Sequence, residues 1–85
     1  MRRYVDGQQL HKLRLEAGLT QEQIAKRLGI SRETVISIEK NHPGTIDKLS
    51  FSTVEAWGRI CRHELRPDVL AEWQSYLKKL LGFAE

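Results

Sequence analysis

Apolar residues recur three and four positions apart along most of the chain, a spacing typical of helices that bury one face. Glycine and proline interrupt this pattern where helices end or turns form. We therefore expect an all-α fold in which residues 1–85 make a single domain. The pattern predicts five helices: one starting at Asp6, two at 20–28 and 31–40, one starting at Ser50 or Ser52, and one over about 67–81.

The strongest helix signals lie in residues 20–41, which have the sequence TQEQIAKRLGISRETVISIEKN. Thr20 can cap a helix, and Gln23 follows three residues later, where its side chain completes a capping box. Ser31 can cap a second helix in the same way. Gly29 lies where the first helix must stop in a left-handed conformation. Two helices joined by so short a turn form a helix-turn-helix unit.

The second helix of this unit has a narrow apolar seam. At about 100° per residue, Val35 and Ile38 fall on one side and continue from Ile30. Most of its circumference is left to face outward, as a helix in a DNA major groove about 12 Å wide requires. The outward side carries Glu33, Ile36, Ser37 and Lys40, with Arg32 near its edge.

The chain resembles the helix-turn-helix family of phage Cro and lambda-type repressors over roughly residues 7–61. The resemblance rests on Leu13-Arg14, Gly18-Leu19-Thr20-Gln21, Ile24-Ala25, Leu28-Gly29-Ile30-Ser31, Val35 and Ile38-Glu39. It implies a compact five-helix lambda-repressor-like DNA-binding domain, a phage-like regulator that binds its operators as a dimer.

The resemblance also implies roles for three side chains. Arg14 is expected to form an ion pair with Glu39 that ties the first helix to the third, two unrelated surface charges being the alternative. Gln21 is expected to touch the DNA backbone and to brace a side chain of the helix over 31–40, which the resemblance makes the recognition helix. An ordinary solvated glutamine is equally consistent with the sequence at this position.

Four residues of the recognition helix are candidates for reading bases. Arg32 is suited to guanine, Glu33 can accept a hydrogen bond from cytosine N4, and Ser37 is permissive. Glu33 could instead only favour the positive end of the helix dipole. Ile36 could lie against a thymine methyl group or simply be an exposed apolar residue.

Four other polar residues are suited to phosphates. Ser31 offers a hydroxyl and an amide at a helix N-terminus, and Thr34 flanks the reading side, where it can reach a phosphate or a base. Lys40 and Asn41 open a polar, mildly basic segment, residues 40–49, that we expect to be a loop. This loop either contacts phosphates beside the groove or only connects two helices.

The C-terminal part of the chain supplies core residues. The inner side of the fourth helix is expected to carry Phe51, Val54, Trp57, Ile60 and Cys61. The helix over 67–81 has more apolar surface than a small core needs, so we expect it both to complete the core and to pair with a second copy. Its apolar stripe consists of Val69, Leu70, Trp73, Leu77, Leu80 and Leu81, with Tyr76 alongside.

Charge and composition narrow the function classes. Residues 1–50 hold nine Lys and Arg against six Asp and Glu, whereas residues 51–85 hold five against five. Together with the motif, this surplus favours a polyanionic partner. No catalytic constellation, cofactor motif or metal-ligand cluster is present, so we expect neither an enzyme nor a bound cofactor. A single cysteine and no apolar run of about 20 residues predict a cytoplasmic protein without a membrane partner.

The sequence thus predicts a sequence-specific transcriptional regulator, a repressor, that binds double-stranded DNA as a homodimer. One alternative is an antitoxin that represses its own operon while binding a toxin. Another is a protein-interaction module that uses the helix-turn-helix only as a scaffold, because a fold does not fix a function.

Overall fold

The computed structural model describes residues 5–82, and the regular structure within them is entirely helical. This confirms the expected all-α fold. The elements are α1 (Gly7–Glu16), α2 (Gln21–Leu28), α3 (Arg32–Glu39), α4 (Pro43–Ile46), α5 (Phe51–Cys61), the 3₁₀ turn η1 (Arg62–Glu64) and α6 (Pro67–Leu81).

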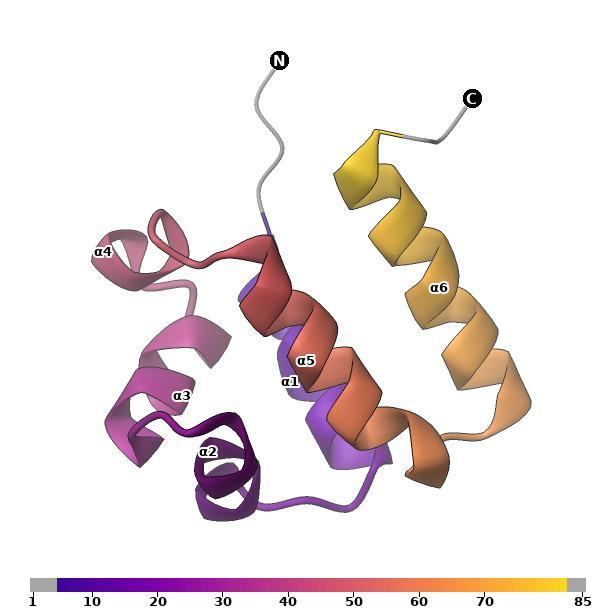
Figure 1. Cartoon of the computed structure of the whole chain (residues 1–85), viewed down its shortest axis with the longest axis horizontal. Helices are drawn as coiled ribbons and strands as arrows, with labels where there is room; N and C mark the ends of the chain where they lie inside the picture. The colour runs from indigo at the N-terminus through magenta and orange to yellow at the C-terminus, as the bar shows by residue number, and fades with distance from the viewer. Residues whose placement is uncertain (1–4, 83–85) are drawn as a thin grey trace.

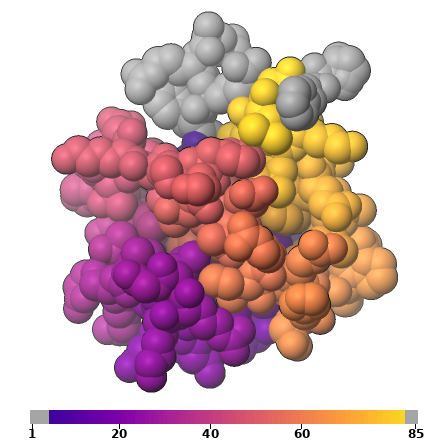
Figure 2. Space-filling model, viewed as in Figure 1, coloured from indigo at the N-terminus to yellow at the C-terminus, as the bar shows by residue number. Residues whose placement is uncertain are grey.

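Helices α1 and α5 pack together in the middle of the molecule (Figure 1). Helices α2, α3 and α4 lie on one side of this pair, and α6 lies on the other, where it packs against α1. The space-filling view shows the same division, with α2 at one edge of the visible face and α6 at the opposite edge (Figure 2). The helix-turn-helix unit and the C-terminal helix therefore present separate surfaces.

The core lies where α1, α2, α3 and α5 meet. Its largest completely buried side chain is Trp57, whose indole Nε1 donates a hydrogen bond to the carbonyl oxygen of Leu10 at 3.1 Å. Cys61 is buried beside it, and this burial raises the pKa of its thiol to about 12. The thiol is therefore a packing group rather than a reactive one. The other fully buried side chains are Leu10, Ile24, Val35, Ile38 and Val54.

The predicted caps of the helix-turn-helix are present. The hydroxyl of Thr20 accepts from the N–H of Gln23 at 3.0 Å, and the Gln23 side chain accepts from the N–H of Thr20 at 2.9 Å. Gly29 ends α2 with a φ of 75°, in the left-handed region. Ser31 caps α3 through a bond from the N–H of Thr34 at 3.1 Å. For α5 the cap is Ser50, one of the two serines that the sequence offered.

Two features differ from the expectation. The segment 40–49, expected to be a loop, contains α4, so the described chain has six α-helices instead of five. Pro43 opens this single turn because a first helical residue needs no N–H partner and proline has the φ it requires. Phe51, expected on the inner side of α5, is 37% exposed because it is the first residue of the helix and lies at the margin of the core.

Helix α6 completes the core with two side chains and leaves an apolar edge outside. Val69 and Trp73 are buried, and a Cβ added at Gly58 would lie 2.2 Å from Nε1 of Trp73, so α5 and α6 approach closely at that point. Leu81 is 47% exposed. No helix in residues 5–82 is long and apolar enough to cross a membrane. The half-buried residues of α6 are Leu70, Tyr76, Leu77 and Leu80.

Candidate nucleic-acid interface

Helix α3 is fixed to the molecule by one side only. Val35 and Ile38 are completely buried, and Glu39, the last residue of the helix, is 4% exposed. Arg32 and Glu33, in the first turn, are exposed. The helix packs against α1, α2 and α4, and α6 lies on the far side of the molecule (Figure 1). Its first turn therefore faces outward, whereas Ile36 and Ser37, expected on the outward side, are half-buried because α3 packs against three helices.

The nine residues predicted to contact DNA fall into two groups by exposure. Five are exposed and four are half-buried, so none is sealed in the core. Arg32 shares a surface hollow with residues at the start of α2, among them Gln21 and Thr20. The exposed five are Ser31, Arg32, Glu33, Lys40 and Asn41, and the half-buried four are Gln21, Thr34, Ile36 and Ser37.

Some of these polar groups already have partners within the protein. The hydroxyl of Ser31 accepts from the N–H of Thr34 and lies 2.8 Å from the Thr34 hydroxyl. Asn41 directs its side-chain amide at α1, where its Oδ1 accepts from the N–H of Gly7 at 2.7 Å. The amide of Asn41 is thus engaged in the protein, which the sequence did not indicate.

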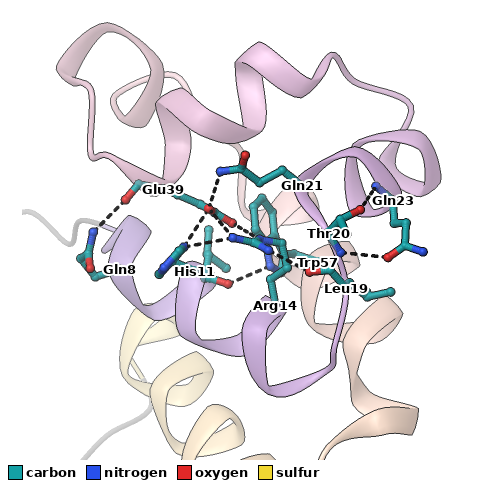
Figure 3. Close-up of polar contacts among 10 residues, drawn as sticks. Gln8, His11, Arg14, Leu19, Thr20, Gln21, Gln23, Glu39 and Trp57 are labelled. Atoms are coloured by element: carbon teal, nitrogen blue, oxygen red, sulfur yellow. Dashed lines mark hydrogen bonds and ion pairs between the residues drawn. The ribbon is translucent and has the colours of Figure 1, made fainter.

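A buried carboxylate at the end of α3, that of Glu39, joins this helix to α1 and α2. Figure 3 shows Glu39 at the centre of a cluster of polar side chains. Arg14 donates two hydrogen bonds to this carboxylate, from Nε to Oε2 at 2.6 Å and from Nη2 to Oε1 at 3.0 Å. Arg14 itself is only 6% exposed. The remaining Nη1 of Arg14 donates to the carbonyl of Leu19 at 2.8 Å. The ion pair expected from the resemblance is therefore a two-bonded contact between α1 and the end of α3.

Two further side chains complete the cluster. Gln21 donates from Nε2 to Oε1 of Glu39 at 3.1 Å, and Nδ1 of His11 lies 2.8 Å from the same oxygen. Sequence reasoning missed His11, although it precedes Arg14 by three residues and so shares its helix face. Gln21 thus contacts a side chain of α3, that of Glu39, while its expected contact with the DNA backbone stays a prediction.

The cluster keeps Glu39 charged. Burial alone would raise the pKa of this carboxyl, but the hydrogen bonds from Arg14, His11 and Gln21 and the positive charge of Arg14 lower it below its ordinary value of 4.5. The carboxylate therefore belongs to the support of α3 rather than to an outward-facing chemical site. Within residues 5–82 there is no group of three His, Cys, Asp or Glu that could hold a metal ion.

A helix-turn-helix with an outward-facing second helix, inside a small all-α domain, is the defining feature of the helix-turn-helix class of proteins. The chain belongs to the helix-turn-helix family, whose profile matches residues 10–57. This confirms the resemblance noted in the sequence.

Two curated relatives carry the same motif. One is an uncharacterized HTH-type transcriptional regulator of Methanocaldococcus jannaschii, 48% identical over 40 residues, which are 47% of this chain and 61% of the relative. The other is an uncharacterized HTH-type transcriptional regulator of Methanothermobacter thermautotrophicus, 41% identical over 46 residues, 54% of this chain and 67% of the relative. The match thus spans about two thirds of each relative or less. No solved structure matches the chain significantly.

Proposed function

We propose that this protein is a sequence-specific DNA-binding transcriptional repressor in which α3 enters the major groove. The observation that carries the proposal is the division of α3 into a buried seam, formed by Val35 and Ile38, and an exposed first turn. An α-helix with its side chains is about 10–12 Å across, which suits a groove about 12 Å wide. The relatives are named as HTH-type transcriptional regulators, which supports the same role.

The exposed and half-buried residues of α3 take different parts in this proposal. Arg32 and Glu33 reach furthest and read bases, Arg32 by a bidentate contact with guanine. Ser37 and Ile36, half-buried on the next turn, make the shorter-range contacts with base edges. Ser31, Thr34 and Lys40 bind phosphates at the two ends of the helix, and Gln21 does so from the start of α2.

Arg32→Ala is expected to reduce discrimination at one base pair of the operator. One good bidentate contact is worth about 1–3 kcal/mol against the wrong base, and the substitution removes it without disturbing a buried group. The measurement is competition binding with a panel of single-base operator variants. If the variant ranks every operator as the parent does, Arg32 does not read a base.

Lys40→Ala is the comparison variant for this experiment. A phosphate contact contributes equally to all sequences, so this substitution should weaken every duplex alike and reduce the slope of log K against log salt by about one. Lys79→Ala, at an exposed position of α6 on the opposite side of the molecule, is the matched control and should change neither quantity.

The whole proposal is tested by selecting bound fragments from random duplex DNA and titrating the best one with salt. A protein that makes six to ten phosphate contacts loses about 10³–10⁵ in affinity between 50 and 200 mM salt. Steep salt dependence with an enriched sequence supports a DNA-binding regulator. Binding to no duplex in dilute buffer contradicts it and favours the protein-interaction alternative.

We also propose that the repressor acts as a homodimer joined through α6. The support is the apolar edge of this helix, where Leu81 is 47% exposed and Leu77 is half-buried in a groove beside α5. Because α6 lies across the molecule from α3, pairing along it leaves the reading side free (Figure 1). Two copies would place their recognition helices in half-sites one helical turn of DNA, about 10 bp, or a multiple of it apart.

Leu81→Glu is expected to weaken self-association by about tenfold or more. The substitution removes the burial of a leucine side chain, which is worth about 1.5–3 kcal/mol. It also places a carboxylate in an apolar contact, where the charge loses its hydration. Sedimentation equilibrium gives the dissociation constant. Leu15→Glu is the matched control, because Leu15 is a comparably exposed leucine on α1, 56% exposed. Weakening by Leu15→Glu instead would move the interface away from α6.

A further inference from the structure

The end of α3 has an unusual choice of residue. Asn41 has a φ of 59° and is the one non-glycine residue of the described chain with a positive φ. Its N–H donates to the carbonyl of Ile38 at 3.0 Å, and the N–H of His42 donates to that of Ser37 at 3.0 Å. This is a Schellman motif, in which glycine is the usual left-handed residue. Because glycine would satisfy the same backbone without strain, the backbone gives no reason for asparagine.

The side chain of Asn41 supplies that reason. Its Oδ1 accepts from the N–H of Gly7 at 2.7 Å, and its Nδ2 donates to Oδ1 of Asp6 at 3.0 Å. The N–H of Gly7 lies in the first turn of α1, where amides have no partner within their own helix. Asn41 therefore ends α3 and caps α1 at the same time.

The two helices are in backbone contact at this junction. A Cβ added at Gly7 would lie 1.8 Å from the carbonyl oxygen of Ile38, so only glycine permits the approach. On the neighbouring residue, Nε2 of Gln8 donates to the carbonyl of Glu39 at 2.9 Å. The positive end of the α1 dipole thus meets the negative end of the α3 dipole.

The junction extends to the C-terminal helix. The hydroxyl of Tyr76, in α6, accepts from the backbone N–H of Asp6 at 2.7 Å. The Asp6 carboxylate that binds Asn41 also accepts from the N–H of Gln8 at 3.0 Å. Hydrogen bonds therefore run from α6 through the cap of α1 to the last turn of α3.

We propose that Asn41 is a positioning residue for DNA recognition: it sets the angle of α3 by fixing its C-terminal end to α1. This inference rests on the DNA-binding role proposed above, and it replaces a phosphate contact by Asn41 with an indirect role. The N-terminal end of α3 is fixed by the short turn after Gly29. Moving the other end therefore tilts the helix and displaces Arg32 and Ser37 from the base edges they read.

The decisive variant is Asn41→Gly. Glycine adopts the left-handed conformation freely, so the Schellman motif persists while both side-chain hydrogen bonds are lost. We expect the ratio of affinities for the selected duplex and its single-base variants to fall about fivefold or more, the discrimination lost with one good base contact. The salt slope should match that of the parent. Binding is measured where circular dichroism shows both proteins folded, with Lys40→Ala as the phosphate-contact comparison.

A second measurement needs no DNA. In the parent protein the amide of Gly7 should be protected from hydrogen exchange, and in Asn41→Gly it should exchange at the rate of a free helix-terminal amide. An unprotected Gly7 amide in the parent overturns the inference, because the bond that carries it is then absent.

The binding outcomes separate this inference from the proposed function. A parent protein that binds no duplex overturns both. A discriminating parent with an equally discriminating Asn41→Gly variant leaves the proposed function standing and overturns the positioning role. A salt slope lowered by about one in Asn41→Gly, with discrimination intact, identifies Asn41 as a phosphate contact and overturns the positioning role too.

Discussion

Glu39→Ala is expected to lower the free energy of unfolding by about 3–5 kcal/mol, the usual cost of removing one partner from a buried ion pair. Arg14, 6% exposed, would keep its charge without the carboxylate that now compensates it. The loss falls on the contact between α1 and α3, so the variant should lose both stability and any DNA binding. Urea unfolding followed by circular dichroism gives the change, provided that the transition stays two-state.

Two control variants separate charge from shape in this cluster. Glu39→Gln keeps most of the volume and an acceptor oxygen, and it should be less destabilising than Glu39→Ala. Replacing both partners, Arg14→Met with Glu39→Leu, removes the uncompensated charge and should cost less than Glu39→Ala alone. A loss below about 1 kcal/mol for Glu39→Ala would mean that the pair contributes only as much as an exposed salt bridge.

The same cluster makes the free energy of unfolding depend on pH. The folded-state pKa of Glu39 is lowered below the ordinary value of 4.5, so the folded protein binds the carboxyl proton less readily than the unfolded chain. Its contribution is fully present above pH 4.5 and is lost as the pH falls through the folded-state pKa. Unfolding free energies measured from pH 6 downward should therefore decline more steeply in the parent than in Glu39→Gln.

Trp57→Ala is the second substitution with a large expected effect, about 3–5 kcal/mol of unfolding free energy. The ring, on α5, is completely buried against α1 and is the largest fully buried side chain. Its removal leaves a cavity at the centre of the molecule and deletes the bond to the carbonyl of Leu10. The midpoint and slope of urea unfolding measure the loss.

Trp57→Phe is the control for this experiment. It retains much of the apolar volume but cannot donate to Leu10, so it should cost a minority of the alanine value. Equal losses for the two variants would show that the hydrogen bond, rather than the packed volume, dominates at this position. A loss of unfolding free energy near zero for both variants would contradict the claim that the buried ring stabilises the core.

The parts of the fold that the sequence predicted are those that depend on near neighbours. The capping box of Thr20 and Gln23, the turn at Gly29 and the cap at Ser31 each involve residues within four positions of one another. Their chemistry can therefore be recognised in a short window. Pro43 carried a comparable signal for α4, but a Pro-Gly pair is as typical of a turn as of a first helical residue.

The parts that were missed depend on residues far apart in the chain. The bond from Asp6 to Tyr76 joins residues 70 positions apart, and the bond from Gly7 to Asn41 joins residues 34 apart. No periodicity encodes such a meeting, because it follows from how α1, α3 and α6 pack in three dimensions. The exposure of Phe51 has the same origin, since helical spacing gives the direction of a side chain but not the limit of the core.

The anchoring of α3 has a consequence for how such a protein could change over evolutionary time. Its tertiary polar contacts lie at its C-terminal end, through Glu39 and through Asn41 just beyond the helix, whereas Arg32 and Glu33 lie exposed at the other end. Substitutions in the first turn therefore leave the supports of the helix in place. A lineage of this fold can acquire new target sequences there without first gaining stability elsewhere, because folding and target choice depend on different ends of one short helix.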